Sequence, residues 1–281
     1  MPEYLPSTVD ADWCDSGGAG ARLLRTLNAA SPFTEGHAPI TIHRLTPCRS
    51  FPSVVAFMPV PARQAPSAIC TTLATDLDGT FIPLAGRPEN LSDLTELKEI
   101  FARDDRTLVY VTGRHFASVQ QEIKESSLPW PDWLICDVGT SLFDHTGAGE
   151  FHSIEAYQEH QATIVGDFTV ERLQSAIESI SGLRLQENEK QGPFKLSFYV
   201  DANRLDELVA QIENRIERLH APYSIIHSVD PFNGDGLIDL LPVGISKAAA
   251  LRWWCEFSGA ADESLVFAGD SGNDLAAMTS G

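Results

Sequence analysis

The sequence Ile69–Thr80, ICTTLATDLDGT, joins a mostly apolar run to two carboxylates and a glycine. The run predicts a buried strand that ends at Asp76. Asp76 and Asp78 are two residues apart and can point to the same side, and Gly79 allows the tight turn that this arrangement needs. One carboxylate can attack phosphorus while the other protonates the leaving oxygen and later activates water. Taken alone, the string also fits a turn closed by an aspartate side chain.

Helices and strands alternate downstream of this segment. Apolar positions over 94–101 fall on one helical face, and Asn90 or Ser92 is expected to cap that helix. Apolar runs over 107–111 and 133–136 predict two more strands, with a second helix between them. Strands that alternate with helices favour right-handed crossovers. We therefore expect an α/β fold with a doubly wound parallel sheet.

The pattern changes after about Phe151. Helical stripes over 170–180 and 205–219 accompany strands over 194–200 and 223–229. Together they predict a small α+β module inserted into the parallel sheet.

The parallel pattern is then expected to resume with the strand Leu237–Leu241, a helix from Ser246 and the strand Leu265–Ala268. Residues 274–281 begin a further helix, after which such a core is expected to continue with another strand. The expected domains are an N-terminal extension (1–66) with at most short strands, a core (67–150 and 237–281) and a cap (151–236).

Three further motifs follow predicted core strands, at the sheet edge where ligands of open parallel sheets bind. Thr112 and Gly113 can hold a phosphoryl oxygen through a hydroxyl and backbone N–H groups, although an ordinary strand-to-helix turn has the same residues. Lys247, at the start of a helix, can neutralise a phosphoryl group, or can be a solvated surface lysine. Asp270 and Asp274 offer the hard oxygen ligands that magnesium prefers, or form a polar loop.

The composition is strongly acidic. The 281 residues include 39 acidic and 20 basic side chains, for a formal net charge of -19. This balance disfavours nucleic acid and anionic membrane surfaces as partners. An acidic site that accepts a phosphate ester also needs a cation, and a divalent metal supplies one.

Five scattered cysteines without a CxxC pair argue against a disulfide framework and a thiolate zinc site. No apolar stretch is long enough to span a membrane, and the start Met1–Tyr4 lacks the features of a signal peptide. We therefore expect a cytoplasmic protein, with a monomer favoured.

The order of these motifs resembles the haloacid dehalogenase superfamily of phosphohydrolases, over about residues 70–281. The resemblance implies that Asp76 is the nucleophile and Asp78 the general acid and base. It implies that Thr112, with Gly113, and Lys247 bind phosphate. It also implies a Mg²⁺ cofactor, and the implied magnesium ligands are Asp76, the backbone carbonyl of Asp78, Asp270 and Asp274.

The insert resembles the α/β cap, type C2B, of the sugar-phosphatase branch. Val138-Gly139-Thr140, the strand 194–201 and the loop 269–274 are similar to those of sucrose-6-phosphate phosphatases. In that family a cap lysine binds the sugar, which implies this role for Lys195 and, by a weaker match, for Asn233. Lys195 lies on the opposite strand face from Phe194 and its apolar neighbours, and that face can line the cleft or meet solvent.

The implied substrate is a small sugar phosphate, with sucrose 6-phosphate the first expectation. Another glycosyl phosphate, such as glucosylglycerol phosphate or mannosyl-3-phosphoglycerate, is the alternative. A different class of function, a non-catalytic domain that binds sugar phosphate, also stays open.

Overall fold

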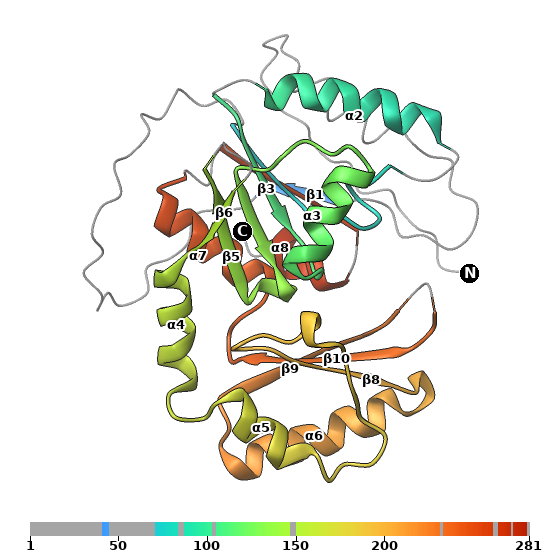
Figure 1. Ribbon diagram of the computed structural model, residues 1–281, viewed down its shortest axis with the longest axis vertical. Helices are drawn as coiled ribbons and strands as arrows, with labels where there is room; N and C mark the ends of the chain where they lie inside the picture. The colour runs from blue at the N-terminus through green and yellow to red at the C-terminus, as the bar shows by residue number, and fades with distance from the viewer. Residues whose placement is uncertain are drawn as a thin grey trace, which may run out of the picture.

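The computed structural model has two parts, a larger core and a smaller cap (Figure 1). The core contains a seven-stranded sheet and the cap a four-stranded sheet. The structure describes residues 41–44, 71–83, 87–102, 105–146, 150–230, 233–260, 264–270 and 272–279.

The core sheet has the order β1-β11-β2-β3-β4-β5-β6. Its four central strands, β11, β2, β3 and β4, are parallel, whereas β1, β5 and β6 each run antiparallel to a neighbour. The α/β fold is therefore confirmed, with a mixed sheet in place of a wholly parallel one. The strand bounds are β1 (Thr41–Arg44), β2 (Thr72–Thr75), β3 (Thr107–Val111), β4 (Trp133–Cys136), β5 (Ser141–His145), β6 (Phe151–Ser153) and β11 (Leu265–Gly269).

Both faces of the central strands are buried. Leu73 of β2 packs with residues of α2 (Pro88–Phe101) and α3 (Phe116–Glu125), whereas the next residue, Ala74, packs with residues of α7 (Lys247–Ser258) and α8 (Gly272–Thr279). Helices thus cover the sheet on both sides, which explains why these strands are apolar along their whole length. Because β2 and β11 are adjacent and parallel, their carboxyl ends bring Asp76 and Asp270 to one edge of the sheet.

The start of α2 differs from the prediction that Asn90 or Ser92 caps this helix. The helix begins at Pro88, and its N-cap residue Arg87 makes no side-chain cap hydrogen bond. Proline has no N–H to satisfy, and its fixed φ suits the first helical position. The prediction overlooked this signal and placed the helix start too late.

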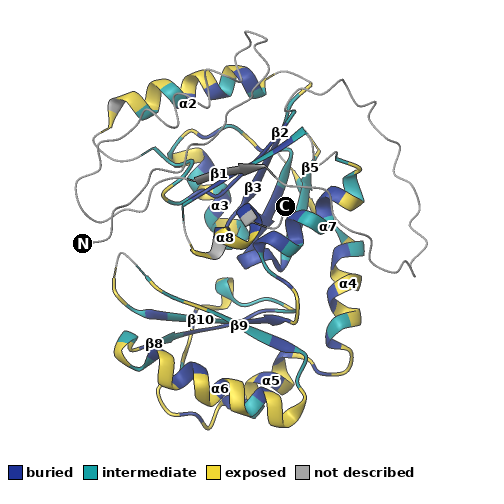
Figure 2. Cartoon of the chain, turned by 180° about the vertical axis from the view of Figure 1, so that it is seen from behind, coloured by how far each residue is buried: buried dark blue, intermediate teal, exposed yellow. Residues whose placement is uncertain are grey.

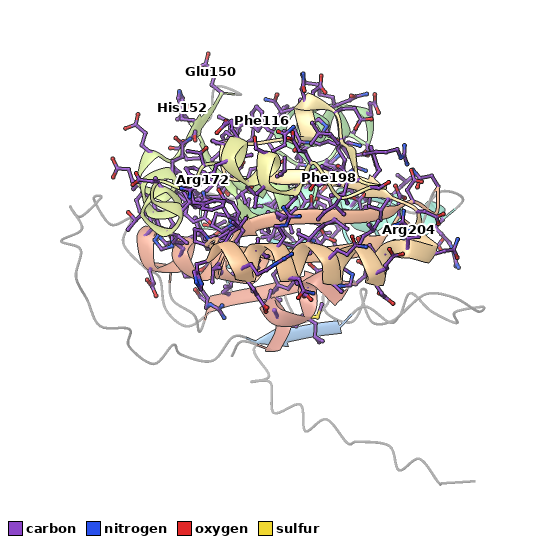
Figure 3. The ribbon with its side chains drawn as sticks, turned by 90° about the horizontal axis from the view of Figure 1, so that it is seen from below. Phe116, Glu150, His152, Arg172, Phe198 and Arg204 are labelled. Carbon is purple, nitrogen blue, oxygen red and sulfur yellow. The ribbon has the colours of Figure 1, made fainter. Side chains whose placement is uncertain are left out.

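The cap is an antiparallel sheet covered on one side by two helices. Its strands have the order β7-β8-β10-β9, and α5 and α6 lie on the side of the sheet away from the core (Figure 1). The helices are exposed on their outer faces and buried toward the sheet, where Phe198 joins their apolar cluster (Figures 2 and 3). The bounds are α5 (Val170–Ile177), β7 (Arg184–Leu185), β8 (Leu196–Val200), α6 (Leu205–Leu219), β9 (Tyr223–Val229) and β10 (Gly236–Pro242).

The predicted domain boundaries need two corrections. The run Leu237–Leu241, expected to resume the parallel core sheet, belongs to β10, which pairs antiparallel with β8 and β9 in the cap. The core therefore resumes near α7 and not at residue 237. At the other boundary, β6 starts at Phe151 but pairs with β5 in the core sheet, so residues 151–153 are not part of the cap. The helix α4 (Glu155–Val165) then leads into the cap (Figure 1).

One strand comes from the predicted N-terminal extension. Residues 41–44 form β1, which pairs antiparallel with β11 at the edge of the core sheet. The rest of 1–66, where at most short strands are expected, lies outside the described residues. Within the part of the chain that is described, no helix combines the length and apolar character that crossing a membrane requires.

Candidate active site

Asp76 and Lys247 form a buried ion pair at the carboxyl end of β2. Lys247 Nζ lies 2.9 Å from Asp76 Oδ1 and 3.0 Å from Asp274 Oδ1, and all three side chains are buried. Lys247 is the first residue of α7, whose N-cap Ser246 accepts a hydrogen bond from Ala249 N. Burial disfavours the ammonium, but Asp76 and Asp274 outweigh it and raise the pKa of Lys247. The lysine therefore stays charged although it is buried, and its burial shows that it is not a solvated surface residue.

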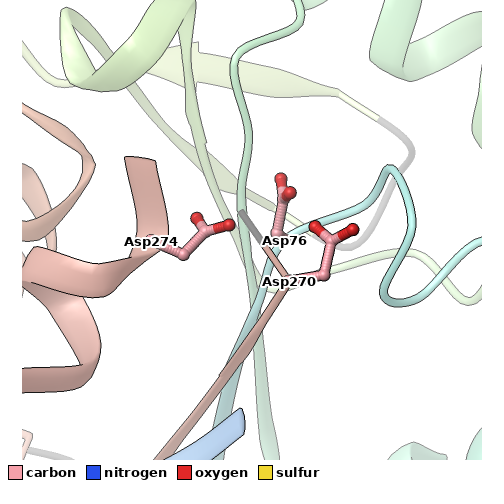
Figure 4. A group of neighbouring side chains, drawn as sticks. All are labelled: Asp76, Asp270 and Asp274. Atoms are coloured by element: carbon pink, nitrogen blue, oxygen red, sulfur yellow. The ribbon is translucent and has the colours of Figure 1, made fainter. Parts of the chain in front are cut away.

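Asp270 completes a cluster of three carboxylates. Ligand atoms of Asp76, Asp270 and Asp274 all lie within 4.8 Å of one another, and the side chains converge from the end of β2, the end of β11 and α8 (Figure 4). Burial raises the pKa of Asp76 to about 6, with Lys247 opposing the shift and Asp274 adding to it. Burial also raises the pKa of Asp270. The cluster therefore carries more negative charge than its surroundings stabilise.

This donor set fits a divalent cation with hard oxygen ligands. Three carboxylates face one ammonium, so full ionisation leaves two negative charges in a mostly buried site. Magnesium prefers carboxylate oxygens and is usually bound by only one or two of them, with water completing its shell. Because Asp274 is fully buried and its Oδ1 contacts Lys247, Asp274 is also suited to holding the lysine in place.

Asp78 is held by an arginine that the sequence reasoning did not select as functional. Arg114 Nε and Nη2 donate to Asp78 Oδ2 and Oδ1 at 2.8 and 2.7 Å. Arg114 Nη1 also donates to Glu122 Oε2 at 2.7 Å, and its hydrogen bond to Asp78 is the largest cause that raises the pKa of Arg114. The sequence held a signal for this role, because Arg114 directly follows the Thr112-Gly113 motif and guanidinium groups bind carboxylates through two parallel bonds.

Gly79 allows the Asp78 loop to lie against Asp270. It adopts φ +72°, and a Cβ there would lie 2.1 Å from Asp270 Oδ2. The next residue, Thr80, donates from Oγ1 to Asp270 Oδ1 at 3.5 Å. The glycine is therefore required twice, for its backbone conformation and for the close contact between the two motifs.

Thr112 and Gly113 lie at the end of β3, next to β2. Thr112 is fully buried, and its Oγ1 accepts a hydrogen bond from Arg114 N at 3.2 Å. Gly113 is exposed. The structure thus places both residues at the sheet edge that carries Asp76, as expected from a parallel neighbour strand.

Lys195 links the cap to the core. Its side chain is buried, with Nζ 3.5 Å from Asp137 Oδ1 in the core and 3.8 Å from Asp239 Oδ1 on β10. Ser197 Oγ also donates to Asp239 Oδ1. The cap face opposite α5 and α6 therefore carries the polar groups that meet the core. Sequence reasoning did not select Asp137 or Asp239, which lie far from Lys195 along the chain.

Asn233 is not brought to this junction by any contact of the described residues. Its side chain is exposed, and Oδ1 accepts a hydrogen bond from Asp235 N, two residues on. This geometry is that of a turn-forming asparagine. The structure therefore gives Asn233 a local role between β9 and β10 and no described contact with the acidic cluster.

Comparison with known proteins places this constellation in a family context. Residues 70–281 match the family model described as sucrose-6F-phosphate phosphohydrolase. A HAD-like hydrolase protein of Nitrosococcus oceani is 35% identical over 74% of this chain and 56% of its own length. Sucrose-phosphatase 1 of Nicotiana tabacum is 29% identical over 75% of this chain and 48% of its own. The chain thus spans about half the length of these two relatives.

Two further proteins are matched over a larger share of their own length. Mannosylfructose-phosphate phosphatase of Agrobacterium fabrum is 31% identical over 73% of this chain and 77% of its own. The solved sucrose-phosphatase of Synechocystis sp. PCC6803, in complex with sucrose and phosphate, aligns with a TM-score of 0.59 and 23% identity, over 74% of this chain and 79% of that one. The structural likeness confirms the fold.

Proposed function

The chain belongs to the sucrose-6F-phosphate phosphohydrolase family, and from this premise we propose that it is a Mg²⁺-dependent phosphatase that hydrolyses a sugar phosphate. The observation that carries the proposal is the mostly buried cluster of Asp76, Asp270 and Asp274 around Lys247. A surplus of buried carboxylates costs stability, and such clusters are characteristic of functional sites. Asp76, Asp270 and the backbone carbonyl of Asp78 are the proposed metal ligands, with Asp274 as a further ligand.

The proposed reaction begins with attack by Asp76. Its carboxylate oxygen forms a bond to phosphorus as the bond from phosphorus to the sugar oxygen breaks, which gives an aspartyl phosphate. Lys247 neutralises charge on the phosphoryl group, and Thr112 and Gly113 hold its oxygens. When bound, Mg²⁺ offsets the charge of Asp76 and of the phosphate, so that one anion can attack another.

Asp78 is the proposed general acid and base. As acid it gives a proton to the departing sugar oxygen. As base it takes a proton from the water that attacks the aspartyl phosphate, which releases inorganic phosphate and restores the Asp76 carboxylate. Arg114 fixes the orientation of the Asp78 carboxylate through two hydrogen bonds. A fixed orientation matters because both proton transfers require hydrogen-bond distance to the reacting oxygen.

The cap supports a sugar as the group attached to phosphate. Lys195, Asp239 and Ser197 place a buried ammonium, a carboxylate and a hydroxyl at the junction with the core. Such groups match the hydroxyls of a sugar, which both donate and accept hydrogen bonds. We propose sucrose 6-phosphate as the first candidate, on the family match and the tobacco relative.

Another glycosyl phosphate is the second candidate. It is supported by the relative named mannosylfructose-phosphate phosphatase and by one named glucosylglycerol-phosphate synthase, 28% identical over 74% of this chain. The cap groups named above recognise hydroxyls in general, so they fit several sugars. Glucosylglycerol phosphate and mannosyl-3-phosphoglycerate therefore belong in the substrate test beside sucrose 6-phosphate.

Phosphate release from a panel of sugar phosphates, with and without Mg²⁺, tests the proposal. Wild type is expected to release phosphate from a glycosyl phosphate only with the metal, and Asp76→Asn is expected to lose turnover by at least about 10³-fold. Asp93→Asn, which changes a half-buried aspartate on α2, is the matched control and is expected to keep activity. Binding without release from any ester would instead support a non-catalytic domain. Similar kcat/KM for simple hexose phosphates would exclude the sucrose assignment.

A further inference from the structure

The turn that carries Val138-Gly139-Thr140 has a strained backbone. Three successive residues of η1 (Asp137–Gly139) have positive φ, at 54°, 59° and 102°. For a β-branched residue such as Val138 this conformation is rare and costs stability. A backbone of this kind persists only where its surroundings hold it, so the contacts of the turn are informative.

One side of the turn is bonded to the proposed phosphate-binding loop. Val138 N donates to Thr112 O at 3.3 Å, and Asp137 N donates to Arg114 O at 2.9 Å. Thr112 is a proposed phosphate ligand, and Arg114 holds Asp78. The turn therefore contacts the backbone on both sides of Gly113.

The other side of the turn packs against the first residues of α7. A Cβ on Gly139 would lie 2.4 Å from Ser246 O and 2.9 Å from Lys247 N. Only glycine leaves room for this contact between two backbones. The position of the turn thus limits where α7 begins. It therefore also limits the position of the Lys247 backbone, from which the side chain reaches Asp76.

Two buried side chains of α4 donate hydrogen bonds to the turn. Tyr157 Oη donates to Gly139 O at 2.6 Å, and Gln161 Nε2 donates to Thr140 O at 2.9 Å. The two residues are four apart and share one face of the helix, and they are 1% and 0% exposed. They therefore satisfy two successive carbonyls at the end of the turn.

The side-chain amide of Gln161 lowers the stability of the folded protein through its oxygen. Its Oε1 is buried and has no hydrogen-bond partner among the described residues. An apolar residue of similar size would avoid this unsatisfied acceptor, at the loss of the bond to Thr140 O. The residue is therefore better explained by placement of the turn than by stability of the helix.

We propose that Tyr157 and Gln161 are positioning residues that fix Lys247 and Thr112 for phosphate binding by holding the Gly139–Thr140 backbone. This inference rests on the proposed phosphatase function for its catalytic consequence. It also gives α4 a second role. The helix that leads into the cap carries the side chains that place two core residues, so the cap connection and the phosphate site share one element.

The test compares Tyr157→Phe with Tyr223→Phe, and Gln161→Leu with Gln186→Leu. The control residues are buried in the cap and donate to backbone carbonyls in the same way, Tyr223 Oη to Phe168 O at 2.9 Å and Gln186 Nε2 to Phe198 O at 3.1 Å. Each pair therefore loses the same kind of bond. Two quantities are measured, hydrogen exchange of the segment 246–251 and kcat/KM for phosphate release. The unfolding temperature of each variant is also recorded, so that its stability can be compared with that of its control.

Tyr157→Phe and Gln161→Leu are expected to speed exchange of segment 246–251 by at least about threefold over their controls and to lower kcat/KM by about tenfold, because small misplacements of catalytic groups are costly. Unchanged exchange relative to the controls overturns the inference. An equal loss of kcat/KM in both members of each pair overturns it too. If the wild type releases no phosphate, the proposed function fails, and the exchange measurement alone decides whether the two residues position Lys247.

Discussion

Arg114 binds Asp78 through both carboxylate oxygens, at 2.7 and 2.8 Å, and so fixes the residue proposed to move protons during hydrolysis. The same guanidinium contacts Glu122 of α3 at 2.7 Å. The proposed general acid is thereby connected to a helix of the core as well as to its own loop. Since such paired bonds define an orientation, Arg114 is expected to affect chemistry more than stability.

Arg114→Lys is expected to lower kcat by about 10- to 100-fold, because a lysine cannot form two parallel bonds and the orientation of Asp78 is lost. KM for the sugar phosphate is expected to change by much less. Arg215→Lys is the matched control, since Arg215 Nη1 donates to Ala176 O within the cap. Steady-state kinetics of both variants check this, and an equal kcat in the two would contradict it.

Gly79→Ala is expected to weaken Mg²⁺ binding at least about tenfold. It is also expected to lower the free energy of unfolding by more than ~1–2 kcal/mol, which is the cost of a left-handed backbone conformation for a residue with a Cβ. The added methyl would meet Asp270 Oδ2 at 2.1 Å. Gly244→Ala separates the two effects, because Gly244 has φ +83° and a Cβ added there would have nothing within 4 Å. Calorimetry and chemical unfolding check this, and equal losses in both variants would show that the contact with Asp270 is unimportant.

Metal-free protein is expected to lose stability as pH rises from about 4 to about 6. The pKa of Asp76 is about 6 when folded, against an ordinary value of 3.8, so the folded state binds more protons in this window. The raised pKa of Asp270 acts in the same direction. Thermal unfolding in EDTA across this range, with Asp76→Asn as reference, isolates the effect. The wild type should fall more steeply than the variant, and a parallel course would refute the assignment.

Mg²⁺ is expected to reverse this loss above about pH 6 and to have little effect well below it. The metal needs ionised carboxylates, so its binding competes with protons on Asp76 and Asp270. A rise in unfolding temperature with added Mg²⁺ at pH 7.5, absent in Asp270→Asn, checks this expectation. Stabilisation of equal size in that variant would place the metal elsewhere.

Lys195→Met is expected to raise KM for the sugar phosphate by at least about tenfold while inhibition by inorganic phosphate stays within about twofold. The lysine is proposed to contact the sugar, and the phosphate is held by Lys247 in the core. Because Lys195→Met leaves the buried Asp137 without its charged partner, the double variant with Asp137→Asn is the stability control. Equal changes in KM and phosphate inhibition would place Lys195 outside the sugar site.

Much of the core could be predicted from local sequence. Apolar runs identified β3 and β4 because central parallel strands are buried on both faces. Asp76 and Asp270 were found because each follows a strand that ends at the same sheet edge, whereas Lys247 was found through the run Leu237–Leu241, which belongs to the cap sheet. Asp76, Lys247, Asp270 and Asp274 thus come together as the sequence predicts.

The assignment of β10 failed because an apolar run does not reveal which sheet a strand joins. One signal was overlooked. Asp239 interrupts the run Leu237–Leu241, and a carboxylate in mid-strand suits a sheet with one polar face better than a strand covered by helices on both sides. Contacts such as Lys195 to Asp137, 58 residues apart, leave no local trace and required the structure.

The neighbouring positions of β2 and β11 bear on how the chain acquires its site during synthesis. Thr80 and Asp270 are 190 residues apart, yet they meet across these two strands. The cap sheet, in contrast, is formed by one continuous stretch, 184–242. A growing chain can therefore complete the cap before β11 leaves the ribosome, and the core sheet can close only afterwards. Until then Asp76 and Lys247 lack Asp270 and Asp274, so the nascent protein is expected to lack the proposed activity until β11 and α8 have been made.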